Sequence, residues 1–266
     1  DMNLSIILFS LSVSNQAHAQ SQPSASPTLR SVVADTDGDG WVETYDARGS
    51  LMEQTWRDSA GLLTNHPDLG YARETMAYDW RGNLTTVAYY DVDSVLVADS
   101  MGVALSRVRY DSENRPVEGA TYGADGELVG DMCMGVARWT QAFDADGNVV
   151  DEAYFNDQNQ PAIGFEGYSR ETRVYDAQGR VTERSWYIGE ALVVTEFGAA
   201  RLAYEYDIEG NPTGETYFGI DGEPMLHALD GIGQWTREYD ASGRVTDEAY
   251  YGTEGDLMLH PDRGIA

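Results

Sequence analysis

Short stretches in which polar residues alternate with apolar or aromatic ones recur along most of the chain. In residues 234–252, "QWTREYDASGRVTDEAYYG", the segment "QWTREY" has the two-residue period of a β-strand. The following "DASG" places Asp first and Gly fourth, as turns with a left-handed fourth residue require. The chain then continues as "RVTDEAYY", which is rich in β-branched and aromatic residues. The pattern predicts a β-hairpin.

This hairpin pattern recurs at intervals of 31 to 33 residues, each time marked by an aromatic residue followed by Asp. The seven pairs are Tyr45-Asp46, Tyr78-Asp79, Tyr110-Asp111, Phe143-Asp144, Tyr175-Asp176, Tyr206-Asp207 and Tyr239-Asp240. We therefore expect an all-β fold in which tandem antiparallel hairpins over residues 41–264 stack into an elongated twisted sheet or solenoid. The alternative is a seven-bladed, propeller-like closure. The hairpin stack is favoured because about 32 residues are few for a four-stranded blade.

Most return strands end in two adjacent aromatic residues, such as Tyr89-Tyr90, Trp186-Tyr187 and Tyr250-Tyr251. Neighbouring residues of a strand point to opposite faces of the sheet, so each pair places one ring on each face. We expect the rings of successive hairpins to form two ladders that take the place of a conventional core. A less regular segment follows each pair and ends at a recurring Gly.

The N-terminal region carries features of export. An apolar run, "LSIILFSLSV", precedes "AHAQ", which predicts a signal peptide over residues 1–19 with cleavage before Gln20. Residues 20–34 are expected to be a Pro/Ser-rich spacer. Residues 265–266 are interpreted as the start of a truncated eighth repeat. The expected location is therefore secreted, periplasmic or at the cell surface.

The composition is strongly acidic. The net charge is −28, with 45 acidic residues against 17 basic ones, and every basic residue is Arg. Such a chain repels nucleic acid and anionic membranes, and we expect neither nucleic-acid binding nor stable membrane insertion. It attracts Ca²⁺ and basic proteins. Cys133 is the single cysteine, so an intrachain disulfide is excluded, and its position between two Met residues suits a small buried residue.

A candidate calcium loop opens the repeat region at residues 35–46, "DTDGDGWVETYD". Carboxylates at alternate positions followed by Gly are typical of D-x-D-x-D-G calcium loops, since clustered carboxylates repel one another unless a cation lies among them. The loop resembles the helix-free calcium loops of thrombospondin type 3 repeats. The expected ligands are Asp35, Asp37, Asp39, the Trp41 carbonyl and Glu43.

Asp46 is claimed both by this loop and by the first aromatic–Asp pair. It stands at position 12 of the loop, where Glu is usual, and it also begins the turn "DARG". The other six repeats keep this Asp without a calcium loop upstream. If Trp41–Tyr45 is a strand, Glu43 and Asp46 also point to opposite faces. The sequence therefore assigns Asp46 to the turn.

The motifs "YDASGRVT", "YDAQGRVT" and "YDWRGNLT" resemble the YD repeats of bacterial Rhs/YD-repeat proteins. The resemblance implies an exported or surface protein whose β-hairpins wind into a spiral sheet, which in that family sometimes forms a shell around a toxin. The repeat is longer here than the usual YD repeat, since it carries an extra "YFGIDGEP"-type segment. The given sequence shows no segment like a toxin or a shell plug after the repeats, so the resemblance leaves a toxin role open but unsupported.

No catalytic constellation is visible in the sequence. His66, His227 and His260 occupy one position of the repeat, four residues before the recurring Gly, so they do not converge in space. Phosphate-loop, GxSxG and HExxH motifs are absent. We expect a secreted, non-catalytic repeat protein with a structural, adhesive or scaffold role that associates with itself through open β edges. The alternatives are a fragment of a larger YD-repeat toxin-delivery protein and a protein that binds or degrades polysaccharide, in which aromatic rings stack on sugars and carboxylates flank one bond.

Overall fold

The computed structural model describes residues 30–34, 40–130, 135–164 and 166–259, with side chains described from residue 40 onward. These residues form strands joined by turns. Among them, no helix has the length and apolarity that crossing a membrane requires. The chain divides into two compact units, Asp1–Val108 and Arg109–Ala266, which we call the N-terminal unit and the C-terminal unit.

The strands of the N-terminal unit are β1 (Arg30–Ala34), β2 (Gly40–Tyr45), β3 (Leu51–Arg57), β4 (Arg73–Tyr78) and β5 (Leu84–Tyr90), and β6 (Leu105–Tyr110) spans the boundary. The C-terminal unit contains β7 (Pro116–Tyr122), β8 (Arg138–Phe143), β9 (Val149–Phe155), β10 (Arg170–Tyr175), β11 (Val181–Ile188), β12 (Ala191–Leu192), β13 (Arg201–Tyr206), β14 (Pro212–Phe218), β15 (Gln234–Tyr239), β16 (Val245–Tyr251) and β17 (Leu257–Met258). Strand β1 covers the last five residues of the segment expected as a spacer and pairs antiparallel with β2.

Six of the predicted hairpins, those marked by Asp46, Asp79, Asp144, Asp176, Asp207 and Asp240, share one register. In β10/β11, Arg170 lies opposite Tyr187, and the register shifts by one residue just before Tyr175. The same shift precedes the aromatic–Asp pair in the hairpins β2/β3, β4/β5, β8/β9, β13/β14 and β15/β16. The cause is the turn, because Gly179 has a φ of 76° and forms the left-handed bulge that closes a four-residue hairpin loop.

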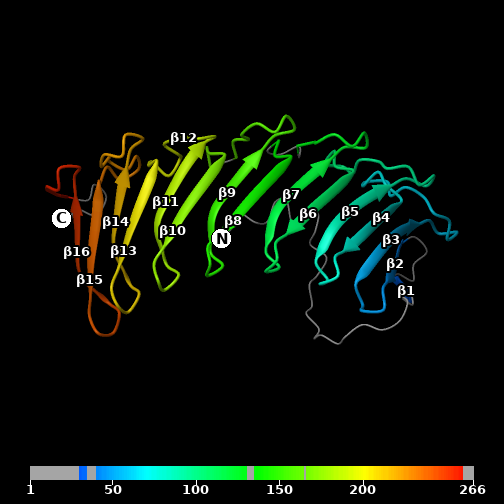
Figure 1. The fold of residues 1–266 in the computed structure, drawn as a ribbon, viewed down its shortest axis with the longest axis horizontal. Helices are drawn as coiled ribbons and strands as arrows, with labels where there is room; N and C mark the ends of the chain where they lie inside the picture. The colour runs from blue at the N-terminus through cyan, green and yellow to red at the C-terminus, as the bar shows by residue number, and fades with distance from the viewer. Residues whose placement is uncertain (1–29, 35–39, 131–134, 165, 260–266) are drawn as a thin grey trace. The chain divides into compact units, whose positions relative to one another are not determined.

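The hairpins continue into one another and do not form separate blades. In the C-terminal unit the return strand of each hairpin pairs antiparallel with the first strand of the next, as β9 does with β10, β11 with β13, and β14 with β15. Figure 1 shows this succession from β8 (green) to β16 (red). The blades of a propeller would be separate sheets, so the open sheet confirms stacked hairpins and excludes the propeller alternative.

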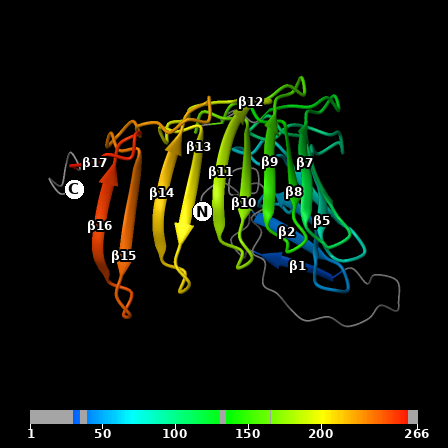
Figure 2. The ribbon, with the colours of Figure 1, turned by 60° about the vertical axis from the view of Figure 1, so that its left-hand side comes forward.

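The two ends of the hairpins differ. In the C-terminal unit the short turns that follow the aromatic–Asp pairs lie at one end of the strands, and the connecting segments lie at the other (Figure 2). These connecting segments fold back over one face of the sheet. We call it the covered face; in the C-terminal unit it carries Trp186, Tyr217 and Tyr250, each at most 6% exposed. These rings pack with Ala199 and Ile232 of the connecting segments.

The opposite face carries the second ring of each aromatic pair, and we call it the arginine face. The arginine that begins a hairpin lies over this ring: Arg138 over Phe155 at 4.0 Å and Arg201 over Phe218 at 3.7 Å from the ring centroid. The expectation of two aromatic ladders without a conventional core is therefore wrong in detail. One ring of each pair is buried beneath a connecting segment, and the other packs against a guanidinium.

Candidate functional site

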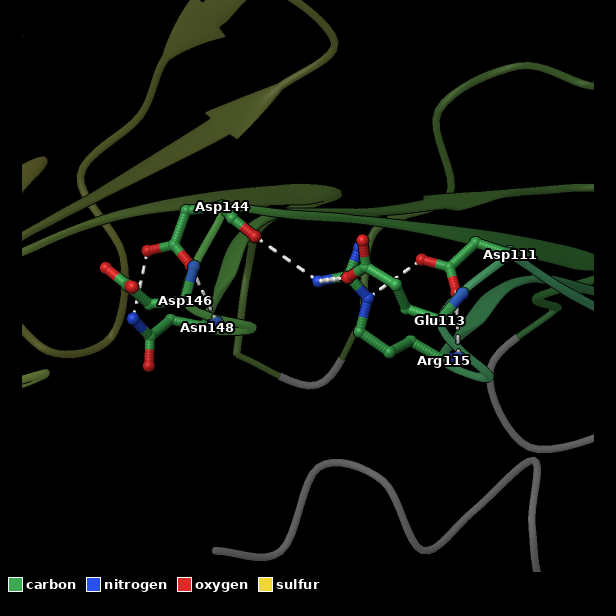
Figure 3. A network of polar contacts seen from close by, with 6 residues as sticks. All are labelled: Asp111, Glu113, Arg115, Asp144, Asp146 and Asn148. Atoms are coloured by element: carbon green, nitrogen blue, oxygen red, sulfur yellow. Dashed lines mark hydrogen bonds and ion pairs between the residues drawn. The ribbon is translucent and has the colours of Figure 1, made fainter.

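The aspartate of each aromatic–Asp pair organises the turn that follows it. Oδ1 of Asp144 accepts hydrogen bonds from the backbone N–H groups of Asp146 and Asn148 at 3.0 and 2.9 Å, and Oδ2 accepts one from the Asn148 side chain (Figure 3). These bonds lower the pKa of Asp144, with the side-chain bond from Asn148 as the largest cause. Equivalent backbone bonds reach Asp46, Asp79, Asp111, Asp176, Asp207 and Asp240. Each of these carboxylates therefore already accepts hydrogen bonds from the backbone of its own turn.

The same turn geometry is present at Asp46. Its Oδ1 accepts the backbone N–H groups of Arg48 and Ser50 at 2.8 and 2.9 Å. The bonds are the same as in the repeats that have no calcium loop upstream. The predicted turn bonds of Asp46 are therefore present, and the prediction that Asp46 takes no part in calcium binding stays a prediction.

The tyrosine of the pair joins its hairpin to the preceding one. The hydroxyl of Tyr206 donates to the carbonyl of Val181, the first residue of the preceding return strand, at 2.9 Å. The hydroxyls of Tyr78, Tyr175 and Tyr239 donate to the equivalent carbonyls of Leu51, Val149 and Pro212. Each half of the motif thus has its own function: Asp shapes the turn, and Tyr holds the neighbouring hairpin.

An arginine just after the turn adds a second link between hairpins. Arg115 forms ion pairs with Asp111 and Glu113 at 2.8 and 2.9 Å, and its guanidinium reaches the Asp144 carbonyl of the next turn at 3.3 Å (Figure 3). It also lies over the ring of Phe143 at 4.6 Å. Arg180 makes the equivalent bond to the Asp207 carbonyl at 2.9 Å.

The arginine face carries a third link, an ion pair between hairpins. Arg170 and Arg201 bind Asp151 and Glu183 of the preceding return strands, with N–O distances of 2.6 and 2.9 Å. Each guanidinium therefore lies between a carboxylate of one hairpin and an aromatic ring of its own. A guanidinium is planar and can stack and form ion pairs at once, which an ammonium cannot do. This geometry accounts for the use of Arg at these positions in a chain without Lys.

One repeat position holds buried glutamates whose pKa values are shifted in opposite directions. Glu171 is 1% exposed and receives ion pairs from Arg173 and Arg184; burial raises its pKa, but these two partners outweigh burial and leave the pKa below its usual value. Glu74 stands at the same position in the N-terminal unit, where burial, and secondarily the charge of Asp99, raises its pKa to about 7.

The cause of the difference is the pair of neighbouring side chains. The two residues that correspond to Arg173 and Arg184 are Met76 and Val87, which belong to the apolar core of the N-terminal unit. Glu74 is only 7% exposed, so its carboxyl group has lost water without gaining a cation from the described residues.

The histidines serve the connecting segments. His66 packs against the rings of Trp41 and Trp56, with ring centroids 5.9 and 4.3 Å apart, and His227 stacks on Tyr217 at 4.7 Å. The backbone N–H groups of Gly70 and Gly231 donate to the carbonyls of His66 and His227 in the same turn geometry. These contacts are structural, as the repeat position suggested. His260 and Cys133 lie outside the described residues.

The candidate calcium ligands are only partly described. Asp35, Asp37 and Asp39 lie outside the described residues, as does the predicted signal peptide. Trp41 and Glu43 lie in β2, which pairs with strands on both sides. The Glu43 carboxylate accepts hydrogen bonds from the Gln54 side chain at 2.9 Å and from the Tyr45 hydroxyl. Within the described part of the chain, no three His, Cys, Asp or Glu side chains come together as a metal site.

Six of the seven repeats have a second turn that the sequence reasoning did not predict; the fifth, with Ile188 at this position, does not. Twelve residues after the aspartate of the pair, another Asp, Asn or Gly begins a turn of the same form, as at Asp58, Asp91, Asn156 and Gly219. Its fourth residue is left-handed: Gly61, Ser94, Asn159 and Gly222 have φ between 60° and 81°. The signal is present in "DSAG", "NDQN" and "GIDG", which begin twelve residues after the aspartate of the pair.

Comparison with models of known families found no match, and comparison with curated proteins found none either. Comparison with solved structures found the crystal structures of TcdB2-TccC3-TEV and TcdB2-TccC3-Cdc42, at 14% and 13% identity over 87% and 82% of this chain, with TM-scores of 0.35 and 0.31. A third is a Photorhabdus luminescens Tc holotoxin pore with a TccC3 mutation, at 14% identity over 81% of this chain and a TM-score of 0.30.

This chain spans only 12% to 13% of the length of those chains. At such low identity and TM-score the likeness carries no argument about function. The functional argument therefore depends on the contacts within the described residues.

Proposed function

We propose that this chain is an exported, non-catalytic scaffold. Its stacked hairpins form a sheet that serves a structural or adhesive role. The observation that carries the proposal is that the polar side chains of the repeat motif bind other parts of the fold. The aspartates bind turn amides, tyrosine hydroxyls bind the preceding hairpin, and arginines bridge hairpins. Groups that bind the fold in repeat after repeat are not free to bind a substrate.

In the C-terminal unit, the polar side chains described on the covered face support a structural role more than a catalytic one. Its polar groups pair with each other: Gln141 donates to Glu152 at 2.8 Å, Trp235 to Glu215 at 2.8 Å, and Arg237 to Glu248 at 2.7 Å. A glycosidase needs one carboxyl group free to donate a proton and a second free to act as a base or nucleophile. The pairings support a structural interpretation of this face.

A panel of polysaccharides tests the proposal. The purified chain is incubated with neutral, acidic and amino-sugar polymers, and new reducing ends are measured over a day. The scaffold proposal predicts no turnover above a heat-unfolded sample. Turnover that Glu215→Gln abolishes without lowering the melting temperature would replace the scaffold with the polysaccharide-degrading alternative.

The toxin-delivery alternative is supported by the YD motif. In that case the hairpin wall would be one segment of a longer surface protein. The complete open reading frame distinguishes the two, because a toxin or anchoring domain joined to the repeats favours delivery. We also propose that the chain binds Ca²⁺ at its first repeat. This proposal depends on Asp35, Asp37 and Asp39, since Glu43 is already hydrogen-bonded within the sheet.

A further inference from the structure

Three consecutive repeats of the C-terminal unit place an exposed aliphatic side chain at one position of the connecting segment. Ile163, Val194 and Leu226 at this position are 52%, 44% and 45% exposed. The third residue of the turn that follows adds Phe197 and Leu229, which are 36% and 81% exposed. We call these five residues the apolar stripe.

The backbone directs these aliphatic side chains away from the sheet. In each of the three repeats, the residue before the stripe position donates its backbone N–H to the sheet. The donors are Ala162, Val193 and Met225, and the acceptors are the carbonyls of Tyr154, Trp186 and Tyr217, at 2.9, 3.0 and 2.9 Å. Ala162 is only 6% exposed, and Val193 and Met225 pack against the buried core. Because neighbouring side chains of an extended segment alternate in direction, the next one points outward.

The fold itself does not require apolar side chains at this position. The first three repeats make the same backbone bond to the sheet, and they have Asn65, Ala98 and Gly130 at the equivalent position. A polar residue, a small residue and glycine are thus all compatible with the fold there. Exposed apolar side chains that gather on one surface without a structural need mark interaction sites.

The spacing of the stripe fits an α-helix. In the C-terminal unit the connecting segments follow one another along one end of the strands (Figure 2). Equivalent residues of adjacent repeats lie two strands apart, which is roughly 10 Å in a β-sheet. A helix presents residues seven apart on one side at intervals of about 10.5 Å. An extended strand repeats on one side every ~6.7 Å and does not match.

The segments that carry the stripe are acidic. Residues 156–167, 188–198 and 219–231 contain no Arg or Lys, and their acidic residues are Asp157, Glu166, Glu190, Glu196, Asp221, Glu223 and Asp230. Glu196 is exposed directly before Phe197, and Glu223 is exposed in the segment of Leu226. Such a surface attracts a cationic partner and repels an anionic one.

We propose that the apolar stripe binds a basic amphipathic helix whose apolar residues recur at every seventh position. This inference rests on the proposed scaffold role and names the partner of its adhesive function. Burial of the apolar residues sets the register of the helix, and its Lys or Arg residues face the acidic segments.

The test uses the full chain and a labelled peptide of three Lys-Ala-Ala-Leu-Lys-Ala-Lys repeats with blocked ends. Fluorescence anisotropy follows binding. We expect saturable binding that Leu226→Gln weakens about fivefold, because it removes part of one aliphatic contact. Leu229→Gln should also weaken it, at a site so exposed that no packing of the chain is lost. Ile208→Gln is the matched control, since Ile208 is 94% exposed in a turn at the other end of the hairpins, and it should leave binding unchanged.

A peptide of the same composition with its Leu residues moved off the seven-residue spacing keeps the charge and is expected to bind about tenfold more weakly. Equal binding of that peptide would show charge attraction alone and overturn the proposal. Equal binding of a peptide with a central Pro, which interrupts the helix, would also overturn it, as would no binding at ~1 mM of peptide. If the peptide fails while the chain dimerises and Leu226→Gln disrupts the dimer, the occupant is a second copy and the proposal is wrong. None of these failures produces polysaccharide turnover, so each is distinguishable from failure of the scaffold role.

Discussion

At the scale of single residues, the same repeat position has different electrostatic consequences in the two units. Glu171 is buried with two arginines, whereas Glu74 is buried beside Met76 and Val87. A carboxyl group in apolar surroundings holds its proton, so its ionisation opposes folding. Titratable groups that face Glu74 are Asp99, which also raises its pKa, and the phenols of Tyr71, Tyr78 and Tyr89.

Glu74→Gln is therefore expected to stabilise the N-terminal unit in a pH-dependent way. The folded pKa of about 7 lies above the unfolded value of 4.5, so the folded state binds more protons between these values and stability falls as pH rises from 4.5 to 7. At pH 8 the substitution should add up to about 3 kcal/mol to the free energy of unfolding, and at pH 4 almost nothing. Amide exchange across β4 and β5 at both pH values measures this difference.

Glu171→Gln is the matched control at the same repeat position. It leaves Arg173 and Arg184 with a neutral partner and should destabilise the C-terminal unit at pH 8, by roughly 1–3 kcal/mol. Stabilisation by both substitutions, or by neither, would contradict the role assigned to the neighbouring arginines.

The calcium prediction also belongs to single residues. Asp37→Ala is expected to abolish the heat of calcium binding, because it removes one of the three clustered carboxylates. Asp46→Asn should leave that heat largely intact, since Asp46 is bonded to the backbone of Arg48 and Ser50. Titration calorimetry at about 10⁻³ M Ca²⁺ covers the affinity of extracellular modules. Equal loss of calcium heat in both variants would show that Asp46 is a calcium ligand.

At the scale of elements, the turns explain which parts of the fold could be predicted from the sequence. The first turn carries Asp and Gly at fixed positions, and both its place and its left-handed Gly were predicted correctly. The second turn was missed because Asp, Asn and Gly alternate at its first position. The fate of the aromatic pairs was also missed, since nothing in "YY" or "WY" shows that a connecting segment covers one ring and an arginine the other.

The left-handed position of the first turn gives a graded prediction. Gly147 has a φ of 91°, and Asn114 occupies the equivalent position of the preceding repeat with a φ of 73°. Gly147→Ala should therefore cost about 1–2 kcal/mol of unfolding free energy, because a Cβ is disfavoured in left-handed backbone. Gly147→Asn should cost less than half of that. Denaturant unfolding of the two variants ranks them, and an Ala variant as stable as the parent would contradict the assigned turn.

At the scale of the whole molecule, neighbouring hairpins within each unit contact one another through local links. Arrays of this kind are stabilised by repeats and their nearest-neighbour interfaces more than by one central core. Where β11 receives β13, all three links are present: the tyrosine hydroxyl, the arginine after the turn and the arginine that begins the hairpin. This organisation predicts that the loss of one link destabilises mainly the neighbouring hairpins, which can be measured.

The most direct measurement is native-state amide exchange of the parent and of Arg201→Ala. The substitution removes the ion pair to Glu183 and the stack on Phe218, so protection should fall in β11, β13 and β14. Strands β8 and β9, two interfaces away, should keep the protection of the parent. A uniform loss across the C-terminal unit would show a single cooperative core and would contradict a scaffold built from neighbour-to-neighbour links.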